Sequence, residues 1–360
     1  MGFSLVKGIG SVRVRMLLDY FGDLETAWNA PTEALLQAGL GEKLVKALQQ
    51  VKATCNLDET WEEIARRNIQ VIPWDDATYP NRLHELDQPP PVIYCRGNLT
   101  PEDDWAVAIV GTRRMTVYGK QVADEIARNL ASQGVTIVSG LARGVDAVTH
   151  LAALDAGGRT IAVLGSGVDQ IYPPEHEKLA ARIMSQGAVL SDYAPGTPPD
   201  SANFPPRNRI ISALARAVIV VEAGESSGAL ITAAFAAEQG REVFAVPGQI
   251  HAPQSQGTNR LIQQGARLLL HPQDVLEVLN MTQVPEQAHL RQALPSDPTE
   301  ALLFSILSRE PRHIDDIWRR SELPIEQVSA TLAIMELKGM VRQVGGMQYI
   351  SVRDEPAEYV

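Results

Sequence analysis

Six short apolar segments, rich in valine and isoleucine, constrain the fold of this chain more than any other feature. Several end in glycine or another small residue, and helical segments separate them. They span residues 107–111, 135–140, 160–165, 188–191, 217–221 and 242–246. Such runs are typical of parallel strands that are covered on both faces. Over residues 105–279 the sequence therefore predicts an α/β fold, a Rossmann-like, doubly wound and mostly parallel sheet. Its ligands should bind beyond the carboxyl ends of the strands.

The region before this sheet predicts a helical domain and a connecting segment. Residues 1–55 contain two turns of the form Gly-x-Gly, each before an apolar-striped helix, as in helix-hairpin-helix or SAM-like domains. Such turns can present backbone amides to a DNA phosphate. Acidic and basic residues nearly balance there, however, which favours a structural or auxiliary role. Residues 56–104 are proline-rich and predict a rigid segment that packs on the central domain.

The C-terminal region predicts a linker followed by a winged helix. Residues 280–298 contain proline and glutamine, and residues 299–360 contain three helical patterns before a hairpin with a glycine turn. The third of these helices would be the recognition helix, yet it carries Glu326 and Glu336 and only Lys338 as a cation. A helix that reads the major groove should be basic. We therefore expect protein contact or packing there rather than DNA reading.

Composition restricts the class of protein. The formal net charge of the 360 residues is −11, so a nucleic-acid site would have to be a local basic patch. Cys55 and Cys95 have no metal or redox spacing and favour a reducing compartment. With neither a signal pattern nor an apolar run of about 20 residues, we expect a cytoplasmic protein without a membrane partner. Dinucleotide and P-loop motifs are also missing, so we expect no cofactor, no metal and no catalytic residue.

Residues 204–211, Phe-Pro-Pro-Arg-Asn-Arg-Ile-Ile, place an aromatic ring, two guanidiniums and an amide just before the strand at 217–221. Forked guanidinium donors suit phosphate, and a flat ring offers a stacking surface. We expect Phe204 to stack and Asn208 to hold the turn. Arg207 and Arg209 are expected to bind phosphate. The alternative is a helix N-terminus whose arginines bond to local carboxylates and carbonyls.

Polar or glycine-rich loops follow four of the expected strands, at 111–119, 139–146, 165–169 and 222–232. A glycine after a strand is also what a short turn requires, so each loop alone is weak evidence. Together with 204–211 they bring four arginines to one sheet edge, which favours an anion-binding site. The candidate binding residues are Gly111, Thr112, Arg113, Arg114, Gly140, Arg143, Gly165, Phe204, Arg207, Asn208, Arg209, Ser227 and Gly228.

Two of these loops carry a resemblance to a known family. Residues 107–119 (Val-Ala-Ile-Val-Gly-Thr-Arg-Arg-Met-Thr-Val-Tyr-Gly) and 139–146 (Ser-Gly-Leu-Ala-Arg-Gly-Val-Asp), with His150, resemble two signatures of the DNA-processing protein A family (DprA, also called Smf). Further similar blocks extend the resemblance over about residues 105–272. The departures are mild and leave the cations and the ring in place: Thr112 stands for the usual Ser, Asp192 for Glu and His176 for Asn.

The resemblance implies a DNA-binding protein that is not an enzyme. Members of the family bind single-stranded DNA in a positive pocket of the Rossmann-like domain and dimerise through that domain. They protect incoming DNA and load the RecA recombinase onto it during natural transformation. By this resemblance Arg113 should contact phosphate. Phe204, Arg207 and Arg209 should border the same pocket.

Two other functions stay open from the residues. A Rossmann-like hydrolase of the nucleoside-monophosphate phosphoribohydrolase type could use Glu222 or Glu225, although its P-G-G-x-G-T loop is missing. The protein could also be a transcription factor that acts through the winged helix, although the acidic third helix argues against this. His150, on the helix after the second loop, should orient a helix or a loop rather than serve as a catalytic base.

Overall fold

The computed structural model describes residues 1–279, 298–308, 311–321, 323–337, 341–344 and 346–351. The chain divides into two compact units, Met1–Thr282 and Gln283–Val360, which are described separately. The expected linker at 280–298 lies outside the described residues except for Pro298, and so does Lys338.

A nine-stranded sheet forms the centre of the first unit, in the order β1-β2-β6-β5-β4-β3-β7-β8-β9. The strands are β1 (Gln70–Pro73), β2 (Val92–Gly97), β3 (Ala106–Val110), β4 (Thr136–Ser139), β5 (Thr160–Val163), β6 (Ala188–Ser191), β7 (Ala217–Val220), β8 (Glu242–Ala245) and β9 (Arg267–Leu268). All pairs from β6 to β9 are parallel. This confirms the predicted doubly wound, mostly parallel sheet.

Two strands of the sheet come from the segment expected to be a connection. β2 pairs antiparallel with β6, and β1 pairs antiparallel with β2. Ile93, Tyr94 and Cys95 of β2 are fully buried. Residues 70–97 therefore complete the sheet and belong to its core, in addition to packing on it.

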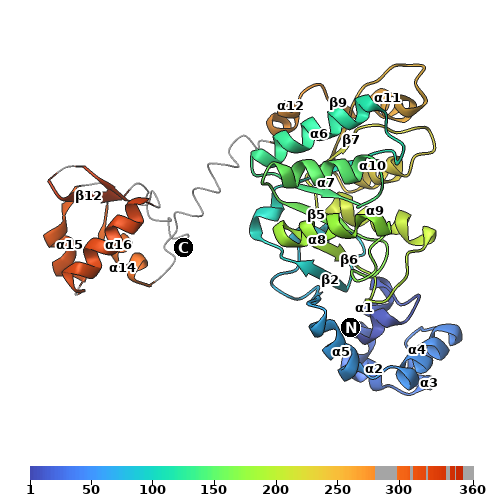
Figure 1. The fold of residues 1–360 in the computed structure, drawn as a ribbon. Helices are drawn as coiled ribbons and strands as arrows, with labels where there is room; N and C mark the ends of the chain where they lie inside the picture. Colours follow the sequence, from blue (N-terminus) through green and yellow to red (C-terminus); the bar gives the residue numbers. More distant parts are fainter. Residues whose placement is uncertain (280–297, 309–310, 322, 338–340, 345, 352–360) are drawn as a thin grey trace. The chain divides into compact units, whose positions relative to one another are not determined.

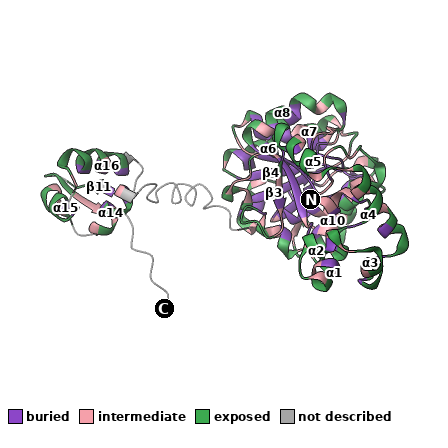
Figure 2. Cartoon of the chain, turned by 90° about the horizontal axis from the view of Figure 1, so that it is seen from below, coloured by how far each residue is buried: buried purple, intermediate pink, exposed green. Residues whose placement is uncertain are grey.

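Helices cover both faces of the sheet because its side chains alternate in direction. Ile161 and Val163 of β5 join one apolar cluster, while Ala162 between them joins another. The first cluster contains residues of α9 (Phe204–Ala213) and α10 (Gly228–Glu238), and the second contains residues of α7 (Val145–Asp155) and α8 (Glu177–Gln186). α6 (Val117–Ser132) packs on α7 (Figures 1 and 2), and α9 packs on α10 (Figure 1). The remaining helices near the last strands are α11 (Gln256–Gln263) and α12 (Pro272–Val278).

The N-terminal helices have an apolar core of their own. They are α1 (Ser11–Phe21), α2 (Leu24–Asn29), α3 (Thr32–Gln37), α4 (Glu42–Thr54) and α5 (Leu57–Arg66). Leu17, Leu35 and Leu48 lie in the core that α1 to α4 share, whereas Ile64 of α5 joins the cluster that contains residues of α7 and α8. A hydrogen bond of 2.6 Å between the hydroxyls of Ser4 and Tyr94 links this region to β2. Short 3-10 helices occupy Gly2–Leu5, Asn81–Glu85, Pro101–Asp104, Pro174–His176, Ser201–Asn203 and Pro253–Ser255.

The second unit is a winged helix, as predicted. Its helices are α14 (Pro298–Ile306), α15 (Ile314–Ser321) and α16 (Ile325–Leu337). A small antiparallel sheet has the order β10 (Arg312–His313), β12 (Gln348–Ser351) and β11 (Val341–Gln343). Leu303, Ile317 and Leu332 are fully buried in its core.

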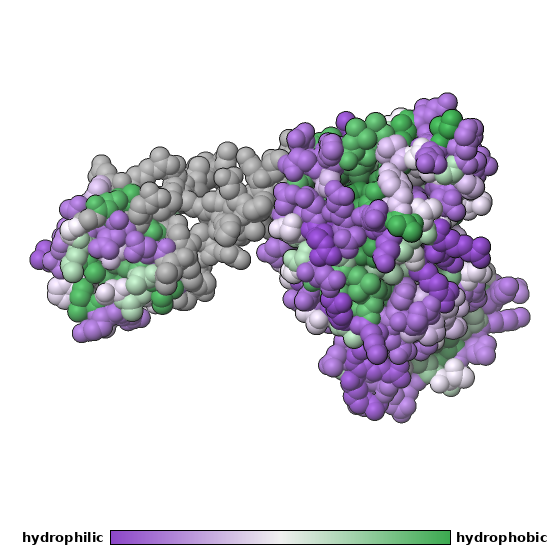
Figure 3. All heavy atoms as spheres, turned by 45° about the horizontal axis from the view of Figure 1, so that its top comes forward, coloured by the Kyte–Doolittle hydropathy of each residue, from purple (hydrophilic) through white to green (hydrophobic). Residues whose placement is uncertain are grey.

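Hydrophilic residues cover most of the face of the first unit that Figure 3 shows, with apolar patches between them. Within the described ranges, every helix is too short or too polar to cross a membrane.

Candidate nucleic-acid interface

An open cavity of about 750 Å³ lies where the order of the strands reverses, beyond the carboxyl ends of β3 and β7. This is the position at which doubly wound sheets bind their ligands, and the volume lies in the range of ligand sites. Nine of the thirteen candidate residues line it: Gly111, Thr112, Arg113, Arg114, Phe204, Arg207, Asn208, Ser227 and Gly228.

Two of the remaining candidates are glycines that allow close packing just behind the cavity. A Cβ at Gly165 would lie 2.9 Å from Cδ1 of Phe204, and a Cβ at Gly140 would lie 2.8 Å from Nη2 of Arg207. Any side chain at these positions would push the ring or the guanidinium out of place. These two glycines therefore contribute to the site by leaving room for the side chains of Phe204 and Arg207.

Phe204 is the centre of an aromatic and cationic cluster. It is the first residue of α9, which has prolines in its first turn. The guanidinium of Arg113 lies 5.4 Å from the centre of its ring, and the ring of Tyr172 stacks beside it at 5.9 Å. Arg113 and its neighbour Arg114 are exposed, and no ion pair among the described residues engages either of them. These two cations are free to bind an anion in the cavity.

Arg207 differs from the free phosphate ligand expected from the sequence. Only 4% of it is exposed, and Nη1 donates to the carbonyl of Gly140 (3.1 Å) and to that of Val163. Nε donates to Oδ1 of Asn208 at 3.2 Å. Burial lowers the pKa of Arg207 to about 10, against the favourable charge of Asp146. Arg207 thus joins the ends of β4 and β5 beneath the cavity.

Both polar atoms of the Asn208 side chain form hydrogen bonds. It accepts from Arg207, and its Nδ2 donates to the carbonyl of Gly228 at 3.3 Å. The amide therefore links the first turn of α9 to the start of α10, two helices that both line the cavity.

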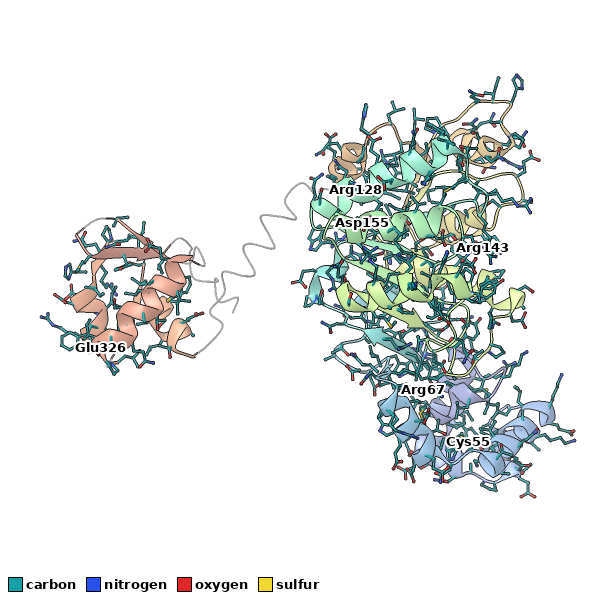
Figure 4. The ribbon with its side chains drawn as sticks, in the orientation of Figure 1. Cys55, Arg67, Arg128, Arg143, Asp155 and Glu326 are labelled. Carbon is teal, nitrogen blue, oxygen red and sulfur yellow. The ribbon has the colours of Figure 1, made fainter. Side chains whose placement is uncertain are left out.

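Arg209 and Arg143 do not line the cavity and are engaged elsewhere. Nη1 of Arg209 donates to the carbonyl of Gln88 at 2.7 Å, and Nη2 donates to Oδ2 of Asp192 at 3.2 Å. Nε of Arg143 donates to Oε1 of Glu175 at 2.5 Å. Arg143 marks the carboxyl edge of the sheet in Figure 4, where Arg128 lies toward the other edge. The helix-terminus interpretation of residues 204–211 thus describes the present bonds of Arg207 and Arg209.

Other residues also line the cavity although they were not among the candidates, notably Asp146, Tyr172 and Thr232. The carboxylate of Asp146 accepts from the amides of Gly140 (3.1 Å) and Ala142 (3.3 Å). Burial raises its pKa, and the charge of Arg207 opposes that rise. Asp146 is the last residue of the loop at 139–146, and Tyr172 follows the loop at 165–169. Their positions in the sequence next to these loops could therefore have identified them as site residues.

The carboxylates of the hydrolase alternative do not line the cavity either. Glu222 is 3% exposed and bonded to Thr116, while Glu225 is exposed. Across the described parts of the chain, no cluster of three or more histidine, cysteine or acidic residues could hold a metal ion.

His150 is fully buried, and its Nδ1 is hydrogen-bonded to the hydroxyl of Thr160 at 2.6 Å. Burial lowers its pKa to about 3, with smaller effects of His176 and Arg207. The imidazole is thus neutral near pH 7 and anchors α7 to β5.

This histidine should make the protein less stable in mild acid. In the unfolded chain His150 takes up a proton near pH 6.5, whereas the folded protein resists protonation down to about pH 3. Stability should therefore fall by about 1.4 kcal/mol per pH unit as the pH drops through this window. Urea unfolding of the wild type and of His150→Gln at several pH values tests this. The difference in free energy of unfolding between the wild type and His150→Gln should change with pH at this slope. A difference that stays constant with pH would contradict the prediction.

Comparison with known proteins agrees with the fold. The sequence pattern of the family described as DNA recombination-mediator protein A matches residues 70–280, and that of the DprA winged helix domain matches residues 287–347. Protein Smf of Synechocystis sp. is 36% identical over 97% of this chain and 97% of its own length. The DNA processing protein DprA of Bacillus subtilis is 44% identical over 59% of this chain and 72% of its own length.

Solved structures extend the comparison. DNA processing protein A of Streptococcus pneumoniae has a TM-score of 0.68 at 33% identity and covers 77% of this chain and 97% of that one. DNA processing protein A of Helicobacter pylori, described for its mode of binding single-stranded DNA, has a TM-score of 0.54 at 33% identity. It covers 59% of this chain and 96% of its own. With matches of this extent in sequence and in structure, the chain belongs to the DNA recombination-mediator protein A family.

Proposed function

We propose that the cavity beyond β3 and β7 binds single-stranded DNA without regard to base sequence. The observation that carries this is the exposed Arg113 guanidinium over the ring of Phe204, 5.4 Å from its centre, in an open cavity. A cation beside an aromatic ring binds phosphate and stacks a base, and neither contact depends on which base is present. The Helicobacter pylori relative, described for its mode of binding single-stranded DNA, supports the same ligand.

Family membership supports the wider role. We propose that the protein protects incoming DNA in the cytoplasm and loads RecA onto it during natural transformation. It does so as a homodimer formed through the Rossmann-like domain, residues 105–279. The helical domain at 1–55 and the winged helix at 299–360 serve as accessory domains. We propose binding, rather than catalysis, as the activity of the site, since Asp146, a carboxylate that lines it, is buried and accepts from two backbone amides.

Arg113→Ala should weaken binding to an oligo-dT strand by at least about tenfold, since one charge-assisted hydrogen bond is worth roughly 1.5–3 kcal/mol. The logarithmic salt slope should also shrink by about 0.7, the value for one neutralised phosphate of a single strand. Fluorescence anisotropy over a range of salt concentrations measures both quantities. A duplex of equal length should bind more weakly than the single strand to the wild type.

Arg128→Ala is the matched control. Arg128 is also exposed, but it is paired with Asp124 on α6 toward the other edge of the sheet (Figure 4). It should bind the strand as the wild type does. Equal affinity of the two alanine variants would contradict the proposed site, and preference for duplex would contradict the proposed ligand.

A further inference from the structure

Glu222 is a buried carboxylate directly beneath the loop that carries Arg113 and Arg114. It lies just beyond β7, is 3% exposed and does not line the cavity. A charged group in such a place is costly unless it is fully hydrogen-bonded. Its bonds therefore indicate what it does.

All of its described bonds go to the two ends of one short loop. The backbone carbonyl of Glu222 accepts from the amide of Thr112 at 2.7 Å. Oε2 accepts from the amide of Thr116 at 2.9 Å, and Oε1 accepts from the hydroxyl of Thr116 at 2.6 Å. Thr116 is in turn the N-cap of α6, since its Oγ1 accepts from the amide of Gly119 at 3.1 Å. One residue thus holds both ends of residues 112–116.

The neighbouring glycines leave room for this carboxylate. A Cβ at Gly119 would lie 2.2 Å from Oε2 of Glu222. A Cβ at Gly111 would lie 3.1 Å from the carbonyl oxygen of Glu222 and 2.6 Å from the side chain of Val145. The first turn of α6 and the end of β3 can therefore approach Glu222 only because both positions lack a side chain.

We propose that Glu222 is a positioning residue, which fixes the loop so that Arg113 and Arg114 face the cavity before a ligand arrives. This rests on the proposed binding of single-stranded DNA. A cation held in place loses less conformational entropy when it binds phosphate than a cation on a mobile loop. The role is also distinct from that of the catalytic carboxylate in the hydrolase alternative.

Two substitutions at this residue separate the roles. In Glu222→Gln the amide oxygen can accept from the amide of Thr116 while the NH₂ group donates to its hydroxyl, so the loop keeps its shape. In Glu222→Ala both bonds are lost. Both variants remove the same charge, so their difference reports the hydrogen bonds together with the buried side-chain volume that only the alanine variant loses. Oligo-dT affinity should stay within about twofold of wild type for the glutamine variant and fall about tenfold for the alanine variant. An equal loss in both variants would overturn the proposal.

A mutant cycle with Arg113 and Arg114 distinguishes positioning from a general loss of structure. In a background that carries both Arg113→Ala and Arg114→Ala, Glu222→Ala should weaken binding by less than twofold, because it acts through these two arginines. A tenfold loss in both backgrounds would show that Glu222 does not act through them. If Glu222→Ala fails to fold, Thr116→Val replaces it, with Thr116→Ser as the control that keeps the hydroxyl. Wild-type binding by Arg113→Ala alone would instead refute the proposed function.

Discussion

Replacing Arg207 by alanine should destabilise the first unit by about 3–5 kcal/mol, the usual effect of removing one partner of a buried charged pair. Asp146 and Arg207 are both buried and interact electrostatically. Without the guanidinium, Asp146 loses its compensating charge, and the carbonyls of Gly140 and Val163 lose a donor. Domains are typically stable by only about 5–15 kcal/mol, so the variant should unfold at much lower urea concentration.

Arg209→Ala is the matched control on the same helix. The side chain of Arg209 is 23% exposed and its pair with Asp192 is 3.2 Å long, so a smaller loss of stability is expected. Urea unfolding followed by circular dichroism compares the two. Replacing both Asp146 and Arg207 by uncharged residues should recover part of the stability. An Arg207→Ala protein as stable as wild type, but weak in DNA binding, would restore the phosphate ligand predicted from the sequence.

Phe204→Ala should reduce affinity for an oligo-dT strand by about 1–3 kcal/mol, the value of stacking one base on an aromatic side chain. This corresponds to a loss of roughly 5- to 150-fold. The ring is partly exposed in the cavity, and Arg113 and Tyr172 hold it in place. Fluorescence anisotropy at one salt concentration measures the change.

Two further variants show whether the ring stacks or only packs. Phe204→Leu keeps apolar volume without an aromatic face, so it should bind nearly as weakly as Phe204→Ala while losing less stability. Phe235 is a partly buried phenylalanine of α10 that does not line the cavity, and Phe235→Leu should bind normally. Tight binding by Phe204→Leu would show that the ring only fills space.

The sheet could be predicted because its strands are continuous apolar runs, and a parallel sheet leaves one edge for ligands. The place of each arginine was harder to predict. Arg207, Ile210 and Ile211 are spaced as one stripe of α9 that continues to its C-cap, Leu214, and all four are buried. That periodicity, read as a helix beginning at the prolines, would have placed Arg207 in the core. Whether this helix is assumed decides between the two interpretations of residues 204–211, arginines that bind phosphate or arginines that bond to local groups.

Other features depended on contacts that are distant in the chain. The pairing of Tyr94 with Ser191 puts β2 into the sheet, and no local pattern selects that partner. The role of Glu222 was hidden for the same reason, because its bonds reach Thr112 and Thr116, more than a hundred residues earlier. Asp146 in the second loop could be seen as polar but not as buried.

The order of the strands also decides when the site can exist. β3 pairs with β7, so Val107 lies beside Ala217, and the amide of Thr112 has its partner in Glu222. Such long-range contacts form late, after more local ones have been made. During synthesis, the loop bearing Arg113 emerges long before the strand that anchors it. A nascent chain that ends before β7 therefore contains Arg113 and Arg114, but nothing holds their loop in place. The site becomes able to bind an anion only when β7 pairs with β3.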